Sequence, residues 1–272
     1  MGYFEENTCD PPCTYTDVNV IDYINITQKF ENGRVLFDNF NYSIKDIKGE
    51  GQFLSILGKS GCGKSQLLKY LADLQEPTSG DILVYGKKHS DENRIPMVFQ
   101  EYSSFPWYTV LQNVSLPLVL KGVDSKEIKD RAMKMIEFVG LSGHEYKWAK
   151  PGQLSGGQLQ RVAIARNLVS NPQILLLDEP LSALDIITKN DIQNLLLKLF
   201  YSKEIDITFV YVTHDIREAV YLSNKVIILG GSPTQVLNEY NIDLGMRTPS
   251  VKHTVDFLNY VKRIDEDFSK VI

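Results

Sequence analysis

The feature that most constrains this chain is a glycine-rich loop placed between an apolar strand and a helix. Residues 58–65 read GKSGCGKS, after the apolar run 53–57 and before a segment with leucines at 67, 68 and 71. Glycines let the backbone curl with its N–H groups inward, and the following helix adds the positive end of its dipole. This context predicts a polyphosphate site, with a chance glycine-rich turn as the alternative.

The polar residues of this loop have expected roles at the polyphosphate. Lys64 is expected to reach the β- and γ-phosphates, and the Ser65 hydroxyl to complete the shell of a Mg²⁺ ion, which prefers oxygen ligands. Cys62 is interpreted as a small packing residue, with redox control through a low thiol pKa at a helix N-terminus as the alternative. ATP and Mg²⁺ are the expected ligands. The residues expected to line the nucleotide here are Gly58, Lys59, Ser60, Gly61, Cys62, Gly63, Lys64, Ser65 and Gln66.

Composition places the chain among large α/β proteins. Its 272 residues are 43% hydrophobic, which is enough for a sizeable core. The apolar runs 174–177 and 226–229 are far shorter than the ~20 residues of a transmembrane helix and indicate buried strands. A net charge of −5 gives no general attraction to nucleic acid, so no nucleic-acid partner is expected.

Residues 1–18 are expected to form a flexible N-terminal extension. They contain acidic residues and no long apolar run, so they do not resemble a signal peptide. Cys9 and Cys13 could supply half of a metal site, but free thiols are the preferred interpretation because no second pair of cysteines follows. Three cysteines in all suit a reducing cytosol.

The rest of the chain reads as a β/α core with two additions. Residues 20–47 alternate β-rich runs around the turn Asn32-Gly33 and suggest an antiparallel β layer. Residues from about 101 to 157 change to helical periods and are expected to form a helical subdomain, in which Asp124 caps a helix. Strands that alternate with helices elsewhere predict an α/β fold whose mostly parallel sheet places ligands at the strand ends.

We expect the main domain to cover residues 19–232 and a tail to cover 233–272. In the tail, the spacing of Val251, Val255, Leu258 and Val261 suggests a short amphipathic helix that packs on its own domain. Phe30 lies on the antiparallel layer, upstream of the phosphate loop. It is expected to stack on an adenine ring, with an ordinary hydrophobic edge residue as the alternative.

Polar side chains follow two of the apolar strands. Asp178 and Glu179 end the run 174–177, and buried carboxylates are costly unless they are paired or coordinate a metal. Asp178 is expected to bind the metal, and Glu179 to orient or deprotonate the water that attacks the γ-phosphate. His214 follows Thr213 at another strand end and is expected to hydrogen-bond the γ-phosphate. It would then sense whether ATP or ADP is bound.

A second candidate anion site lies at the start of another helix. Ser155, Gly156 and Gly157 precede a helical run, and helix N-termini attract anions. Because one chain already has a phosphate loop, this second site makes most sense if it serves the nucleotide of another chain.

Taken in order, these segments resemble the motifs of ATP-binding cassette (ABC) transporter ATPase subunits over about residues 20–232. Residues 58–65 match the Walker A motif, 154–158 the signature, 174–179 Walker B and 182–185 the D-loop. Gln100 matches the Q-loop and His214 the switch histidine.

The resemblance implies a P-loop NTPase core with helices on both faces of its sheet, and ATP hydrolysis coupled to transport. It implies catalytic roles for Glu179, His214 and Gln100. The implied metal ligands are Ser65, Gln100 and Asp178. The nucleotide-binding residues outside the phosphate loop would be Phe30, Ser155, Gly156, Gly157, Gln158 and Asp185.

The resemblance also implies partners. An ATP-dependent homodimer, transmembrane permease subunits and, indirectly, a substrate-binding protein are expected, with the chain peripheral on the cytoplasmic side of the cell membrane. Phe105, Trp107 and Tyr108 are expected to form the groove for a cytoplasmic helix of the permease, because aromatic residues are enriched at binding hot spots. The alternative places Trp107 in the core of the helical subdomain.

Residues 98–114 and 212–222 resemble the nitrate, sulfonate and taurine import group, which implies a small anion or organic solute as cargo. Leu181 and Ser182 stand where that group often has Phe-Gly, so other transport groups, such as lipoprotein release or amino-acid uptake, stay open. A non-transport ABC ATPase is a further alternative, although the long coiled coil of the DNA-repair class is not visible here.

Overall fold

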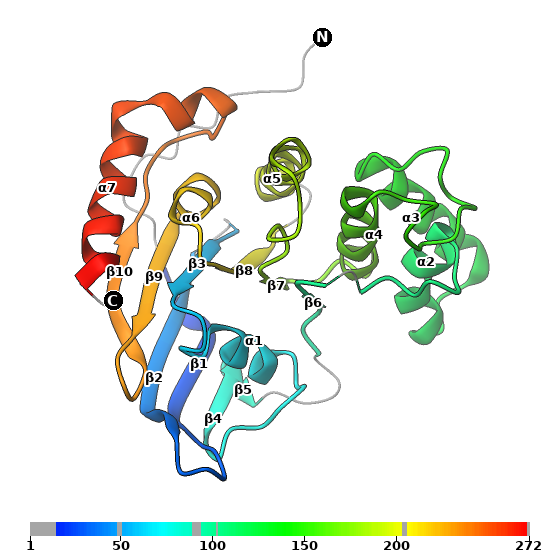
Figure 1. Ribbon diagram of the computed structural model, residues 1–272. Helices are drawn as coiled ribbons and strands as arrows, with labels where there is room; N and C mark the ends of the chain where they lie inside the picture. Colours follow the sequence, from blue (N-terminus) through cyan, green and yellow to red (C-terminus); the bar gives the residue numbers. More distant parts are fainter. Residues whose placement is uncertain (1–14, 48–50, 89–93, 102, 203–205, 271–272) are drawn as a thin grey trace.

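The computed structural model describes residues 15–47, 51–88, 94–101, 103–202 and 206–270, which form two sheets and a helical arm (Figure 1). In the six-stranded sheet the order is β10-β9-β3-β8-β7-β6, and all pairs are parallel except β10 with β9. Its strands are β3 (Phe53–Gly58), β6 (Met97–Val98), β7 (Ile174–Asp178), β8 (Thr208–Thr213), β9 (Lys225–Gly230) and β10 (Gln235–Asn241).

The second sheet is antiparallel, in the order β2-β1-β4-β5, and confirms the predicted β layer. Its strands are β1 (Tyr15–Lys29), β2 (Val35–Ile47), β4 (Ser79–Val84) and β5 (Lys87–Lys88). Residues 15–18, which were expected in the flexible extension, belong to β1. Cys9 and Cys13 lie outside the described residues.

Helices cover both faces of the six-stranded sheet, as predicted (Figure 1). Successive residues of a strand point to opposite faces, so Leu175 and Leu177 of β7 pack in one core while Leu176 packs in the other. The first core holds residues of α4 to α7, and the second holds residues of α1 and the antiparallel sheet. The helices are α1 (Lys64–Leu71), α2 (Val110–Leu120), α3 (Ser125–Phe138), α4 (Gly156–Leu168), α5 (Ile186–Phe200), α6 (Ile216–Leu222), α7 (Val255–Lys270) and the 3₁₀ helix η2 (Pro249–His253).

We call residues 103–168, which contain α2, α3 and α4, the helical arm; it lies to the right of the sheets in Figure 1. Asp124 caps α3 by accepting a hydrogen bond from Lys126 N, and Ala132 and Ile136 are the buried side chains of that helix. The cap is the one that the sequence predicts. α4 leads from the arm back to β7 in the sheet.

The tail contains the predicted helix, but the buried face of that helix is different. In α7 the buried side chains are Phe257 and Ile264, whereas Val255 is 72% exposed and Leu258 is 46% exposed. The larger Phe257 ring is the anchor, with the Arg217 guanidinium of α6 5.3 Å from its centroid. Val251 and Val261 are partly buried against the same core, so the helix packs on its own domain as predicted, but with Phe257 rather than an aliphatic side chain as its anchor. In the described ranges, no helix is long and apolar enough to cross a bilayer.

Candidate active site

The glycines of the phosphate loop are required by its shape. Gly63 caps α1 with φ 99°, and a Cβ there would lie 2.6 Å from the Phe37 ring. At Gly58 a Cβ would meet Cys62 Sγ at 2.5 Å and the backbone oxygen of Leu229 at 2.9 Å. Positive φ and close approach both favour glycine, so the loop has the compact form that the sequence predicts.

Lys64 is buried across this loop. Its side chain is 5% exposed, and Nζ donates to the carbonyl oxygens of Gly58 at 2.7 Å and Lys59 at 3.1 Å. Nζ also lies 3.9 Å from Glu179 Oε1. The ammonium group is therefore held at the junction of α1 and β7, where its carbonyl partners can be exchanged for phosphate oxygens.

Ser65 and Asp178, the expected metal-binding pair, lie together. Ser65 Oγ donates to Asp178 Oδ1 at 2.8 Å. Burial raises the pKa of Asp178, the hydrogen bond from Ser65 opposes that rise, and the neighbouring charge of Glu179 adds to it. A cation here would favour the ionised carboxylate. A hydroxyl and a carboxylate fit Mg²⁺, which proteins commonly hold with one or two carboxylates and substrate phosphates.

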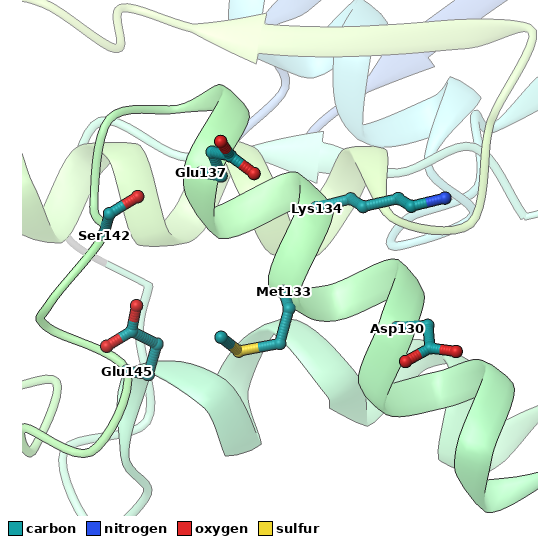
Figure 2. A pocket seen from close by; sticks show the side chains of 6 residues that line it. All are labelled: Asp130, Met133, Lys134, Glu137, Ser142 and Glu145. Atoms are coloured by element: carbon teal, nitrogen blue, oxygen red, sulfur yellow. The ribbon is translucent and has the colours of Figure 1, made fainter.

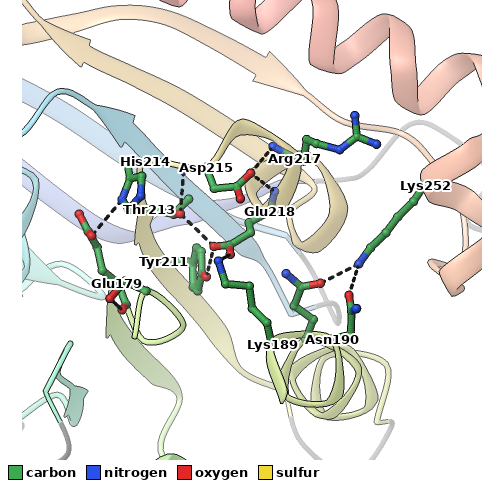
Figure 3. Close-up of polar contacts among 12 residues, drawn as sticks. Glu179, Lys189, Asn190, Tyr211, Thr213, His214, Asp215, Arg217, Glu218 and Lys252 are labelled. Atoms are coloured by element: carbon green, nitrogen blue, oxygen red, sulfur yellow. Dashed lines mark hydrogen bonds and ion pairs between the residues drawn. The ribbon is translucent and has the colours of Figure 1, made fainter. Parts of the chain in front are cut away.

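Glu179 and His214 face each other at the ends of β7 and β8 (Figure 3). Glu179 has φ 44°, a left-handed conformation that is rare for a residue with a side chain, and its N–H donates to Val212 O at 3.0 Å. His214 Nδ1 lies 3.0 Å from Glu179 Oε2, and the imidazole is 64% exposed. The carboxylate is thus placed between Lys64 and His214, as required for a group that orients water beside a phosphate.

Glu218 is a buried carboxylate that the sequence analysis missed. Its Oε2 accepts hydrogen bonds from Tyr211 OH at 2.9 Å and Thr213 Oγ1 at 3.0 Å, and Lys189 Nζ lies 2.7 Å from Oε1. Thr213 Oγ1 also accepts from Asp215 N at 3.0 Å, so this group shapes the backbone on both sides of His214 (Figure 3). Burial and the charge of Glu218 hold the pKa of Tyr211 well above its usual range.

Arg34 is a second residue that the sequence analysis missed. Its Nη2 donates to the carbonyl oxygen of Gly61 at 2.7 Å, so the start of β2 supports the phosphate loop from outside. The available signal was its place directly after the Asn32-Gly33 turn. That signal does not identify its partner, which comes from a different part of the chain.

The signature and D-loop residues form a separate group. Ser155 caps α4, and Gly156, Gly157 and Gln158 form its first turn. Asp185 caps α5 by accepting from the backbone N–H groups of residues 187 and 188. A Cβ on Gly157 would lie 2.2 Å from Thr188 Cγ2, so the two helix starts pack together. The side chains of Ser155 and Asp185 bond to backbone N–H groups in the first turns of their own helices.

The remaining candidate residues lie around the loop. Lys59 and Ser60 are exposed on it, and Gln66 is half-buried in α1. Gln100 is exposed just beyond β6, and Phe30 is partly buried against the core of the antiparallel sheet. The adenine-stacking role of Phe30 and the metal-binding role of Gln100 stay predictions.

The solvent exposure of Cys62 and Trp107 bears on two alternatives from the sequence. Burial raises the pKa of the Cys62 thiol despite Lys64 and the nearby N–H groups, which counts against the low-pKa redox interpretation. Trp107 is 62% exposed, so it is not a core residue of the arm. Its ring centroid lies 5.4 Å from that of Phe105 and 6.4 Å from that of Tyr108, which places the predicted aromatic cluster on the surface.

A hollow of about 350 Å³ on the helical arm was not predicted. It lies between α3 and the loop that follows it (Figure 2). Its lining residues are Asp130, Met133, Lys134, Glu137, Ser142 and Glu145. Among the described residues, no cluster of three or more His, Cys, Asp or Glu side chains is arranged to hold a metal ion, in this hollow or elsewhere.

Comparison with known proteins places this geometry in a family context. A model of the ABC transporter family matches residues 38–182. An uncharacterized ABC transporter ATP-binding protein of Methanocaldococcus jannaschii is 44% identical over 245 residues, which is 88% of each chain. The aliphatic sulfonates import ATP-binding protein SsuB of Bacillus cereus is 37% identical over 234 residues, which is 86% of this chain and 88% of the relative.

Two further matches are a relative that the chain covers only in part and a solved structure. The spermidine/putrescine import ATP-binding protein PotA of Pasteurella multocida is 40% identical over 231 residues, which is 81% of this chain but 60% of that relative. A solved dimeric structure of an ATP-binding cassette in a post-hydrolysis state, bound to ADP and Pi, is similar in fold with a TM-score of 0.70. It is 36% identical, and the match covers 82% of this chain and 99% of that chain.

Proposed function

This chain belongs to the ABC transporter family, and from that premise we propose that it is the ATP-hydrolysing subunit of an importer for a small anion or organic solute such as nitrate, a sulfonate or taurine. Membership makes the chain an ATP-binding ATPase of a transport system. The observation that carries the proposal is the meeting of Lys64, Glu179 and His214, with Ser65 and Asp178 alongside.

Each of these groups has a chemical task in hydrolysis. The loop N–H groups and Lys64 bind the β- and γ-phosphates, and charge that develops on the leaving oxygens is stabilised there. Glu179 orients the attacking water and accepts its proton, and its hydrogen bond with His214 fixes the carboxylate. His214 contacts the γ-phosphate from the end of the neighbouring strand, β8. Mg²⁺, held by Ser65, Asp178 and Gln100, would neutralise phosphate charge when it is bound.

We further propose that a complete site needs two chains. Ser155, Gly156, Gly157 and Gln158 begin α4 and are separate from the phosphate loop of their own chain. A head-to-tail dimer would place these groups against the γ-phosphate held by the other chain, with Asp185 beside it. The similarity to a dimeric cassette bound to ADP and Pi supports this arrangement. Closure would exclude water other than the attacking one, which strengthens the electrostatic contacts.

The transport partner is proposed from the exposed aromatic cluster. Phe105, Trp107 and Tyr108 lie just beyond Gln100, on the arm that also carries the signature residues. A cytoplasmic helix of a permease in this groove would be moved when two ATP-bound chains close. The chain would then lie on the cytoplasmic side of the cell membrane, and a substrate-binding protein would take part indirectly.

The identity of the transported solute is the most specific part of the proposal. The similarity to SsuB, an aliphatic sulfonates import protein, supports an organic anion, and residues 98–114 and 212–222 resemble the same import group. The similarity to PotA, a spermidine/putrescine import protein, favours a polyamine importer as the second candidate.

The test is transport by the complete system. The chain is co-expressed with the membrane protein and the binding protein encoded beside it, and the complex is reconstituted into vesicles. We expect ATP-dependent uptake of a labelled sulfonate, nitrate or taurine, which the Glu179→Gln variant abolishes. Uptake of spermidine or putrescine in place of the anions would select the second candidate. ATPase activity stimulated by nucleic acid, without uptake, would contradict the importer proposal.

A further inference from the structure

The start of the signature helix is held by a histidine that the hydrolytic mechanism does not use. In the capping box of α4, Gln158 N donates to Ser155 Oγ at 3.2 Å and Ser155 N donates to Gln158 Oε1 at 2.9 Å. The remaining polar atom of the Gln158 side chain, Nε2, lies 3.2 Å from His144 Nε2. On the far side of the ring, His144 Nδ1 lies 3.3 Å from the carbonyl oxygen of Ser142.

These contacts define one protonation state of the ring. Because Gln158 Oε1 is used by the capping box, the amide presents only N–H donors to His144, so His144 Nε2 must accept. The carbonyl oxygen of Ser142 only accepts, so Nδ1 must carry the proton. The two constraints agree on the neutral imidazole with its proton on Nδ1.

We propose that His144 is a positioning residue for the signature segment, and that its neutral Nδ1–H form locks the Gln158 side chain and hence the capping box that presents Ser155 to a nucleotide. Ser155 Oγ accepts from Gln158 N, so its own O–H remains available as a donor to phosphate. This inference rests on the proposed composite site, in which Ser155 serves the nucleotide of the partner subunit.

Protonation of His144 removes the hydrogen bond that Gln158 Nε2 donates to the ring. In the imidazolium both nitrogens are donors, so Nε2–H would face the N–H groups of Gln158. If the amide turns to offer Oε1 to the ring, its NH₂ group faces Ser155 N–H and the capping box is lost. Either arrangement loses one hydrogen bond at the start of α4. Histidine is the side chain that ordinarily changes charge between about pH 5 and 8, so a pH series is the natural test of this contact.

The loop that carries His144 is tied to the aromatic segment. Leu111 N donates to Glu145 O and Val110 N donates to Lys147 O, both at 2.9 Å, and Ala149 N donates to Tyr108 O at 3.0 Å. The loop that holds Gln158 is therefore hydrogen-bonded to the proposed permease groove. A shift of the groove would reach Ser155 through these contacts.

Several charged groups surround this loop. Glu145 lies next to His144 in the chain, and its Oε1 accepts from Gly143 N at 2.8 Å. Asp130, Lys134 and Glu137 of α3 line the hollow beside the loop. On α4, Arg161 Nη1 donates to Val139 O at 2.6 Å. The loop, α3 and α4 therefore each contribute charged groups to the surroundings of this loop.

The chain contains a matched capping box without such a histidine. At the start of α2, Gln112 N donates to Thr109 Oγ1 at 3.2 Å and Thr109 N donates to Gln112 Oε1 at 2.9 Å. In the described structure, Gln112 Nε2 has no hydrogen-bond partner. A capping box therefore forms without a ring against its amide, so His144 is an addition to the signature helix rather than a requirement of its fold.

The test compares three variants of the full chain with the unmodified protein. His144→Ala removes the acceptor, His144→Gln supplies a carbonyl oxygen that accepts at every pH, and His253→Gln changes an exposed histidine of η2 as the matched control. We measure kcat and KM for Mg-ATP from about pH 5.5 to 8. At pH 7.5 we expect His144→Ala to lower kcat about 2- to 10-fold, as for one lost hydrogen bond, with nucleotide affinity of the phosphate loop unchanged.

On acidification the unmodified protein and His253→Gln should fall toward the His144→Ala rate. His144→Gln should keep its rate, apart from any decline that all four proteins share. Equal profiles for the unmodified protein and both His144 variants would overturn the proposal, as would an acid loss in His144→Gln equal to that of the unmodified protein.

A readout independent of turnover separates this inference from the composite site. Imidazole ¹⁵N NMR, assigned with His144→Ala, should give an unprotonated Nε2 and a protonated Nδ1 for His144 at neutral pH. The opposite tautomer would overturn the positioning role even if ATP drives dimerisation. The expected tautomer together with an ATP-bound Glu179→Gln protein that stays monomeric would instead place the failure in the composite site.

Discussion

Two residues at the end of β7, Asp178 and Glu179, are held in states that destabilise the folded chain when nothing is bound to it. Glu179 has a left-handed backbone, which costs an ordinary residue roughly 1 to 3 kcal/mol. Asp178 is ionised less readily than usual, because burial raises its pKa. Both residues lie where a phosphate and a cation would bind. The fold tolerates these destabilising states because β7 and β8, the strands that hold the two residues, are buried.

The charge of Asp178 gives a pH-dependent prediction for stability. A folded-state pKa above the usual value means that the folded chain binds this proton more tightly than the unfolded chain, so ionisation destabilises the fold at neutral pH. The cost is relieved as the pH falls through the raised pKa. Asp178→Asn should therefore raise the urea midpoint at pH 7 in the absence of nucleotide, with a smaller gain at acid pH. The exposed Asp81→Asn serves as the control, and an equal gain in both variants would contradict the burial argument.

The second residue-scale prediction concerns Lys64. Lys64→Ala removes the cation that lies across the phosphate loop, so ATP hydrolysis should fall by at least about 100-fold and nucleotide affinity should drop, as expected for a phosphate-clamping charge. Lys88→Ala, on the exposed strand β5, should leave both unchanged. Turnover and nucleotide titration on the same preparations check this. Near-normal turnover in Lys64→Ala would mean that the loop does not hold the substrate phosphates.

The sequence predicted the site residues that directly follow a strand or begin a helix. Ser65, Asp178 and His214 fall into this class, because the end of a buried parallel strand fixes where the next polar side chain lies. Arg34 and Glu218 were missed for the opposite reason. Their partners come from distant parts of the chain, and nothing in the local pattern specifies them.

Among the elements, the tail differs most from expectation. β10 alternates polar and apolar residues at a sheet edge, and its pairing with β9 depends on tertiary contact rather than on its own pattern. β6 is short, because only Met97 and Val98 pair with β7. Helices were predicted better, since Asp124 and Ser155 supply caps that mark where α3 and α4 begin.

The orientation of α7 can be tested with adjacent residues. Phe257 is fully buried, so Phe257→Ala should cost about 3 to 5 kcal/mol of unfolding free energy. Leu258 is 46% exposed, and Leu258→Ala should cost about 0.5 kcal/mol or less. Urea denaturation of the two proteins measures the difference. Equal costs would mean that α7 is rotated about its axis relative to the structure.

The aromatic cluster is tested by separating folding from assembly. Trp107 is 62% exposed, so Trp107→Ala should change stability by no more than about 0.5 kcal/mol. The same change should weaken assembly with the permease by about 2 kcal/mol or more, because buried aromatic anchors dominate interfaces. Leu237→Ala, on β10, is the control with another exposed apolar side chain. Unfolding of the Trp107→Ala protein, or undiminished assembly, would remove the cluster from the proposed groove.

At the scale of the whole molecule, the proposed mechanism treats the chain as carrying two incomplete halves of one site. The phosphate loop and the strand ends of β7 and β8 would form one half in the sheet, and the start of α4 would form the other on the arm. A helix N-terminus stabilises a nearby anion by only about 0.3 to 2 kcal/mol, too little to drive hydrolysis alone. Combined across two chains, the halves would make each ATP a link between subunits, and hydrolysis would break that link.

The most direct test of this account is the mass in solution of Glu179→Gln, which should bind ATP without cleaving it. With Mg-ATP the protein should run at twice the 30.9 kDa of one chain, and without nucleotide at 30.9 kDa. Glu179→Gln combined with Ser155→Arg should bind ATP and stay monomeric, because the second half of the site is blocked. A Glu179→Gln protein that binds ATP yet remains monomeric at high concentration would contradict the two-chain site.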